Sequence, residues 1–147
     1  MHRTSLSSIL TALCVIVFLS IPAKASPQGS QYCDLKMTKS GNFFKGKTFQ
    51  ATKYYPRQKK RRVINKLVKA LAREKLMISS INKKQGFIVA HEPVRYGKGK
   101  TIPYNFMVQK KGNGVTVDAI LAVAPMLIAK KGEARRFFCR VYAAVGR

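Results

Sequence analysis

Between Arg57 and Lys75 the apolar residues repeat every three or four positions, and this spacing restricts the fold more than any other part of the sequence. Such spacing places them on one stripe of an α-helix. The stripe consists of Val63, Ile64, Leu67, Val68 and Leu71. Lysine and arginine fill another face, and no glycine or proline interrupts the run. The pattern predicts an amphipathic helix that buries one side.

Short β-prone segments precede and follow this helix. We expect strands at residues 47–55, 77–82, 87–94, 104–109 and 115–125. The last four form two hairpins, because a glycine-containing turn lies between the members of each pair. The last segment is apolar on both sides, which indicates a central strand with both faces at least partly covered.

A second helical stripe runs from Glu133 to Val145, and Gly146 follows it as a stop signal. The element order is therefore strand, helix, four strands and helix. This order predicts an α+β fold, a single two-layer domain over residues 47–147. It would contain an antiparallel sheet of about four to five strands, with both helices on one face.

The run ALAREKLMISSINKKQGFIVA, residues 70–90, and the order of elements resemble small bacterial periplasmic domains of the helix-grip type. The resemblance is to the domains of BamC, an accessory lipoprotein of outer-membrane β-barrel assembly, and covers roughly residues 47–145. It implies this fold and an envelope setting, and it carries over no functional residue. The chain departs from the family in lacking a lipobox and in its charge.

The first 25 residues have the pattern of a cleaved secretory signal. Arg3 supplies a basic start, an apolar run of 13 residues follows from Ile9 to Ile21, and a small-residue A-x-A site ends at Ala25. Thirteen residues are too few to span a bilayer comfortably. We therefore expect a periplasmic or secreted mature chain that starts at Ser26 and has no transmembrane segment.

Cleavage leaves two cysteines, Cys33 and Cys139, because Cys14 lies in the signal. In an oxidising compartment the simplest expectation is a disulfide between them, and the alternative is two unpaired buried thiols. The disulfide would tether a flexible leader, residues 26–46, to the second helix. Neither cysteine lies in a C-x-x-C motif, so we expect no metal and no cofactor.

The charge is extreme for a chain of this size. There are 29 lysines and arginines against five acids, a net charge of +24. Removal of residues 1–25 takes only Arg3 and Lys24, which leaves the mature chain at +22. Such an imbalance favours anionic partners over neutral ones.

Four consecutive cations begin the first helix, where the helix dipole repels them. An anion bound there would reverse that cost, because free backbone N–H groups and cationic side chains would converge on it. A cationic loop, residues 93–103, is a second candidate contact for the same anion. The candidate anion-binding residues are Lys59, Lys60, Arg61, Arg62, Lys66, Arg95, Lys98 and Lys100. The alternative interpretation is a solvated basic face.

The loop sequence GKGKT, residues 97–101, ends like a phosphate-binding P-loop but lacks the first glycine and the following helix that such a site needs. Catalytic residues are also scarce. His91 is the only histidine left after cleavage, and its neighbour Glu92 would point to the opposite face of a strand. Asp118 lies among apolar residues, where we expect it to pair with a cation.

These features predict a non-enzymatic envelope protein that binds anionic surface material: lipopolysaccharide, anionic lipid or an acidic protein. Peripheral membrane contact would be compatible with this function. The alternative is a secreted nucleic-acid-binding protein, because Tyr54, Tyr55 and Tyr96 are interleaved with the basic residues and could stack on bases. A small secreted hydrolase or an enzyme inhibitor is a third hypothesis.

Overall fold

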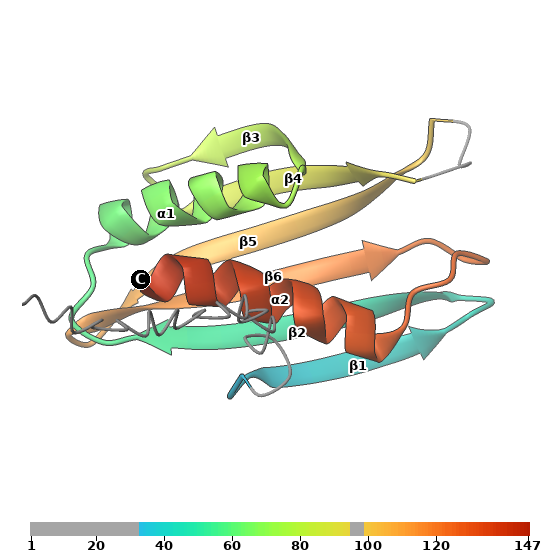
Figure 1. The fold of residues 1–147 in the computed structure, drawn as a ribbon, viewed down its shortest axis with the longest axis horizontal. Helices are drawn as coiled ribbons and strands as arrows, with labels where there is room; N and C mark the ends of the chain where they lie inside the picture. The colour runs from blue at the N-terminus through green and yellow to red at the C-terminus, as the bar shows by residue number, and fades with distance from the viewer. Residues whose placement is uncertain (1–32, 95–98) are drawn as a thin grey trace, which may run out of the picture.

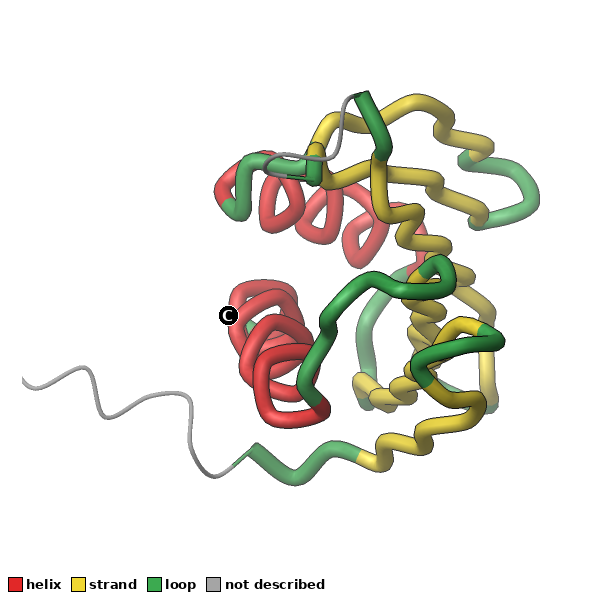
Figure 2. Tube along the Cα trace, turned by 90° about the vertical axis from the view of Figure 1, so that its right-hand side faces the viewer, coloured by secondary structure: helices red, strands yellow, loops and turns green. Residues whose placement is uncertain are grey.

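The computed structural model describes residues 33–94 and 99–147, so the expected signal peptide lies outside the described residues. The elements are β1 (Lys36–Asn42), β2 (Gly46–Tyr55), α1 (Lys60–Arg73), β3 (Met77–Asn82), β4 (Phe87–Pro93), β5 (Thr101–Lys111), β6 (Gly114–Val123) and α2 (Lys131–Gly146). The strands form one antiparallel sheet in the order β1-β2-β6-β5-β4-β3. Both helices cover the same face of this sheet (Figures 1 and 2). The predicted α+β class is confirmed.

The sheet has six strands, one more than the upper number predicted from the sequence. The additional strand is β1, which lies in the segment expected to be a flexible leader. Its sequence, KMTKSGN, has no alternation of apolar and polar residues, because as an edge strand it packs only Met37 against the core. Backbone pairing with β2 holds it instead, a contribution that side-chain patterns do not reveal.

Strand β6 is central, as predicted, and lies between β2 and β5. The side chains on its helix-facing side are buried, among them Val117 and Leu121. The other side is covered only in part, since Thr116 is buried whereas Ile120 is 40% exposed. This arrangement brings β2 against β6, so residues far apart in the sequence meet at the centre of the sheet.

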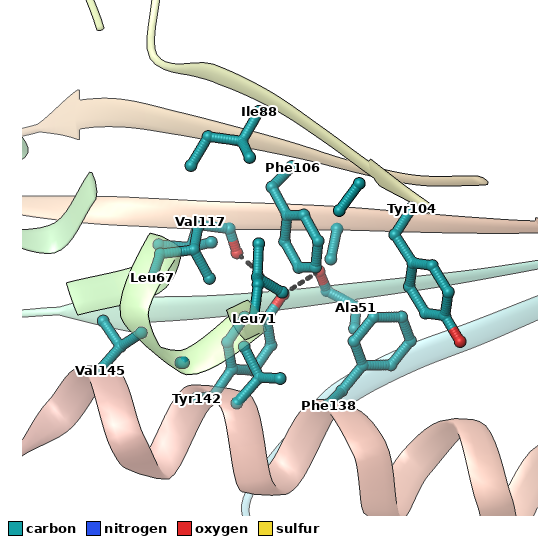
Figure 3. Packing of buried hydrophobic residues seen from close by; sticks show 14 of the residues in the cluster. Ala51, Leu67, Leu71, Ile88, Tyr104, Phe106, Val117, Phe138, Tyr142 and Val145 are labelled. Carbon is teal, nitrogen blue, oxygen red and sulfur yellow. Dashed lines mark hydrogen bonds between the residues drawn. The ribbon is translucent and has the colours of Figure 1, made fainter. Parts of the chain in front are cut away.

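The core fills the space between the sheet and the two helices (Figure 3). The predicted stripe of α1 is buried there, except for Val68, which is only partly covered. From α2, Phe138, Val141 and Val145 point toward the sheet and are almost completely buried. Burial of such side chains contributes about 1.5–3 kcal/mol each. The apolar periodicity of both helices is thus explained by one shared core.

A disulfide joins Cys33 to Cys139, as predicted, across a sequence separation of 106 residues. Further contacts hold the same segment, because Arg135 donates a hydrogen bond to the carbonyl oxygen of Cys33 at 3.1 Å. The Lys53 ammonium also donates to the carbonyl oxygen of Asp34 at 2.9 Å. The start of the described chain is therefore attached to both α2 and β2.

The helices run antiparallel, side by side (Figures 1 and 2). Near the end of α1 the carboxylate of Glu74 accepts hydrogen bonds from the guanidinium of Arg140 in α2, with a shortest N···O distance of 2.6 Å. It is the only ion pair within residues 33–94 and 99–147. Neither of the two helices in the described residues is long and apolar enough to cross a membrane.

Candidate anion-binding site

Three cationic segments meet at one end of the molecule. Helix α1 begins at this end, and the antiparallel sheet brings the β3–β4 and β5–β6 turns to it as well (Figure 1). The cations of these segments are Lys59, Lys60, Arg61, Arg62, Lys83, Lys84, Lys110 and Lys111, which we call the basic end. The three segments contain no aspartate or glutamate.

At the start of α1, no side chain of the helix itself compensates the positive end of the helix dipole. Lys59 occupies the N-cap position without a side-chain cap, and the first turn contains no acidic residue. The helix begins at Lys60, later than the pattern suggested, because Arg57 adopts a left-handed φ of 54° where the chain turns out of β2. Free N–H groups and cationic side chains therefore coincide here.

A shallow cavity of about 420 Å³ lies along the solvent-facing side of α1. Its lining consists of Lys59, Arg61, Arg62, Asn65, Lys66 and Lys69. The Nζ atom of Lys66 is buried and has no hydrogen-bond partner in the described part of the chain. A buried ammonium without a partner is costly, so an anion in this cavity would offset its desolvation.

A second cavity of about 440 Å³ separates α1 from the β3–β4 turn, with Lys83 and Lys84 on its far side. Lys60 bridges the two elements, because its ammonium donates to the carbonyl oxygens of Lys84 at 3.0 Å and Gln85 at 2.9 Å. Of the four cations that begin α1, Lys60 is therefore held by the protein itself. Lys60 therefore has a structural role, in addition to any role in anion binding.

The candidate set drawn from the sequence omits Lys83, Lys84, Lys110 and Lys111. Each pair is typical of an ordinary polar turn, and each lies more than 20 residues after the start of α1 in the sequence. Only the strand pairing shows that both turns reach the end of the sheet where α1 starts. No local sequence signal identifies them.

The cationic loop of the sequence-based set is not brought to the basic end. Arg95 and Lys98 lie outside the described residues. Lys100 precedes β5, eight residues before Val108, whose N–H donates to the carbonyl oxygen of Gly86 in the β3–β4 turn. At about 3.3 Å per strand residue, Lys100 lies roughly 26 Å from that turn. A strand, β5, follows GKGKT, so the helix of a P-loop is missing.

The remaining candidate residues have ordinary structural partners. The Tyr104 hydroxyl donates to Glu92 at 2.5 Å on the helix-facing side of the sheet, and His91 points to the opposite face, 3.5 Å from the Thr101 hydroxyl. Asp118 accepts a hydrogen bond from Thr52 at 2.7 Å, so the expected ion pair with a cation is wrong. Within the described ranges, no group of three histidine, cysteine or acidic residues is arranged to bind a metal.

No known protein-family model matches this sequence, and no curated protein matches it either. The basic end, by its geometry and charge, is the feature of the molecule that points to a function.

Proposed function

We propose that this chain is an exported, non-enzymatic envelope protein that binds anionic surface material through its basic end. The pattern of residues 1–25 supports export, and so does the Cys33–Cys139 disulfide, since disulfides persist in oxidising compartments. Anionic lipid or lipopolysaccharide would supply the negative charge at an envelope surface.

One observation carries the proposal: cations from three separate segments converge around the uncapped start of α1. The cavity that Lys59 lines there extends along the helix to Lys66, whose buried Nζ atom has no partner among the described residues. Without an anion, this arrangement combines mutual repulsion with an unfavourable helix dipole. A solvated basic face would have no need to bury one of its ammonium groups. Bound phosphate or carboxylate groups would relieve both costs at once.

Neutralising part of the basic end tests the proposal. In the triple variant Lys59→Gln, Arg61→Gln and Arg62→Gln, we expect affinity for anionic phospholipid vesicles and for lipopolysaccharide to fall at least about tenfold at roughly 0.15 M salt. Lys60 is left intact because it holds the β3–β4 turn.

The matched control removes the same charge from the opposite end of the molecule, in Lys45→Gln, Lys130→Gln and Lys131→Gln. These three exposed residues lie in the β1–β2 turn and at the start of α2 (Figure 1). We expect a loss of less than about threefold at the same salt concentration. Equal losses in both triples would replace a defined site with a general effect of net charge, and no binding by the unmodified protein would reject the function.

The alternative, a secreted nucleic-acid-binding protein, is supported by Tyr54. This side chain is 42% exposed beside the basic end, where its hydroxyl donates to the Asn113 side chain at 2.9 Å. An exposed ring among cations suits base stacking. This function predicts a steep log–log fall of single-stranded DNA affinity with salt, together with a loss of about tenfold or more in Tyr54→Ala. Vesicle binding that exceeds DNA binding at the same salt concentration would decide against it.

A further inference from the structure

We infer that the anionic ligand is an amphiphile, with its charged group at the start of α1 and its hydrocarbon chain in an apolar cavity beside the Cys33–Cys139 disulfide. The inference rests on the proposed function and narrows the ligand to a lipid, rather than a soluble polyanion or an acidic protein.

The cavity has a volume of about 510 Å³, within the usual range for a ligand site. It lies between the start of the described chain, the end of β2 and the last turns of α2. Its apolar lining consists of Leu35, Pro56, Ala143, the disulfide, Tyr55 and Tyr142. Most of this surface is apolar.

The tyrosine hydroxyls and the lysine ammonium of the lining already have hydrogen-bond partners, whereas the exposed Asp34 carboxylate has none among the described residues. The Tyr55 hydroxyl donates to the carbonyl oxygen of Tyr142, and the Tyr142 hydroxyl donates to that of Ala51, each at 2.8 Å. The Lys53 ammonium is held by the carbonyl oxygen of Asp34. A polar ligand would find few open donors or acceptors in this cavity, whereas a hydrocarbon chain needs none.

The position of the charged headgroup follows from the cations that lie close to the apolar cavity. Pro56 lines the apolar cavity, and Lys59 lines the cationic cavity on α1 only three residues later. Their Cα atoms are therefore at most about 11 Å apart. Arg57 lies between them, and Tyr55 pairs with Val115, directly after the β5–β6 turn. A hydrocarbon chain emerging near Pro56 would thus place its headgroup among cations.

The binding experiment uses the full mature chain and three probes below their aggregation concentrations. Dodecyl phosphate supplies charge and chain, tripolyphosphate supplies charge alone, and dodecyl maltoside supplies the chain alone. We expect dodecyl phosphate to bind most tightly. In the series octyl, decyl and dodecyl phosphate, each added methylene should raise affinity by up to about fourfold, because it leaves water for an apolar site. A flat series would overturn the inference.

The variant Ala143→Trp fills the cavity from an exposed position on α2. We expect it to weaken dodecyl phosphate binding by at least about tenfold while tripolyphosphate affinity changes less than about twofold. The control is Ala72→Trp on the exposed face of α1, outside this cavity, and it should leave both affinities unchanged. Thermal unfolding monitored by circular dichroism verifies that both variants fold.

The outcomes separate the two proposals. If Ala143→Trp affects neither probe, or if dodecyl phosphate and tripolyphosphate lose affinity equally, the cavity does not hold the chain and the basic end still binds anions. If the triple variant Lys59→Gln, Arg61→Gln and Arg62→Gln binds tripolyphosphate as tightly as the unmodified protein, the proposed function itself fails.

Discussion

Tyr55 and Tyr142 connect the last residue of β2 to α2: the Tyr55 hydroxyl donates a hydrogen bond of 2.8 Å to the main-chain carbonyl oxygen of Tyr142. The Tyr142 hydroxyl in turn donates to the carbonyl oxygen of Ala51, at 2.8 Å (Figure 3). The two phenols thus fix the position of α2 along β2. Both rings are buried, and each hydroxyl therefore has the hydrogen-bond partner that a buried polar group requires.

Removing one of these hydroxyls should destabilise the fold. We expect Tyr142→Phe to lower the free energy of unfolding by about 1–2 kcal/mol, because the carbonyl oxygen of Ala51 loses a hydrogen bond inside the core. Urea denaturation measures this change. Tyr54→Phe is the matched control, since its hydroxyl bonds an exposed side chain, and it should cost less than about 0.5 kcal/mol.

The same tyrosines should make stability depend on alkaline pH. Burial raises the pKa of Tyr55 and of Tyr142, and burial and then the Glu92 hydrogen bond raise the pKa of Tyr104. The folded chain therefore keeps protons that the unfolded chain releases near pH 10. This contribution is complete below about pH 10 and is lost as pH rises toward the folded-state pKa values.

The comparison of the unmodified protein with Tyr142→Phe isolates that contribution, because deprotonation of lysines acts on both chains alike. Between about pH 9 and pH 11.5, the stability difference between the two proteins should shrink as pH rises. A difference that stays constant over this interval would show that the Tyr142 phenol does not hold its proton more strongly in the folded state.

The disulfide should be a major source of stability. In the chain-entropy model a loop of this length contributes about 4–5 kcal/mol. We expect Cys33→Ala with Cys139→Ala to lose a comparable amount, measured by urea denaturation. Reduction of the unmodified protein should give a similar loss. A change below about 1 kcal/mol would mean that β1 and the Arg135 contact hold this segment without the bond.

Gly86 should tolerate substitution less well than Gly112. Both have positive φ, 88° and 56°, so alanine is strained at either position. A Cβ at Gly86 would also collide with the carbonyl oxygen of Val108 and the Lys60 side chain, whereas at Gly112 nothing lies within 4 Å. We expect Gly86→Ala to cost at least about 1 kcal/mol more than Gly112→Ala in the free energy of unfolding.

Lys60→Gln should affect stability more than Lys59→Gln does, whereas Lys59→Gln should affect vesicle binding more. Lys60→Gln removes the ammonium that bonds the carbonyl oxygens of Lys84 and Gln85, so it should lower stability by about 1 kcal/mol. Lys59→Gln should leave stability nearly unchanged and should lower vesicle affinity more than Lys60→Gln does. If Lys60→Gln has the larger effect on binding and none on unfolding, the structural role assigned to Lys60 is wrong.

The sequence by itself determined the elements whose side chains face a core. The apolar stripes of α1 and α2 revealed both the element type and the buried side, and the apolar residues on both sides of β6 indicated a central strand. The Cys33–Cys139 disulfide was the simplest expectation, because only two cysteines remain after the expected cleavage, and the structure decided it against two unpaired thiols. The four cations at the start of α1 were visible as a local run.

The features that depend on long-range backbone pairing were decided only by the tertiary structure. β1 shows no apolar pattern because it is held by hydrogen bonds to β2, so its sequence resembles a leader. The strand order brings Lys84 and Lys111 to the start of α1 and carries Lys100 to the other end of the sheet. Side-chain periodicity reports which residues avoid water, whereas the neighbours of an exposed cation depend on strand order, which no local pattern contains.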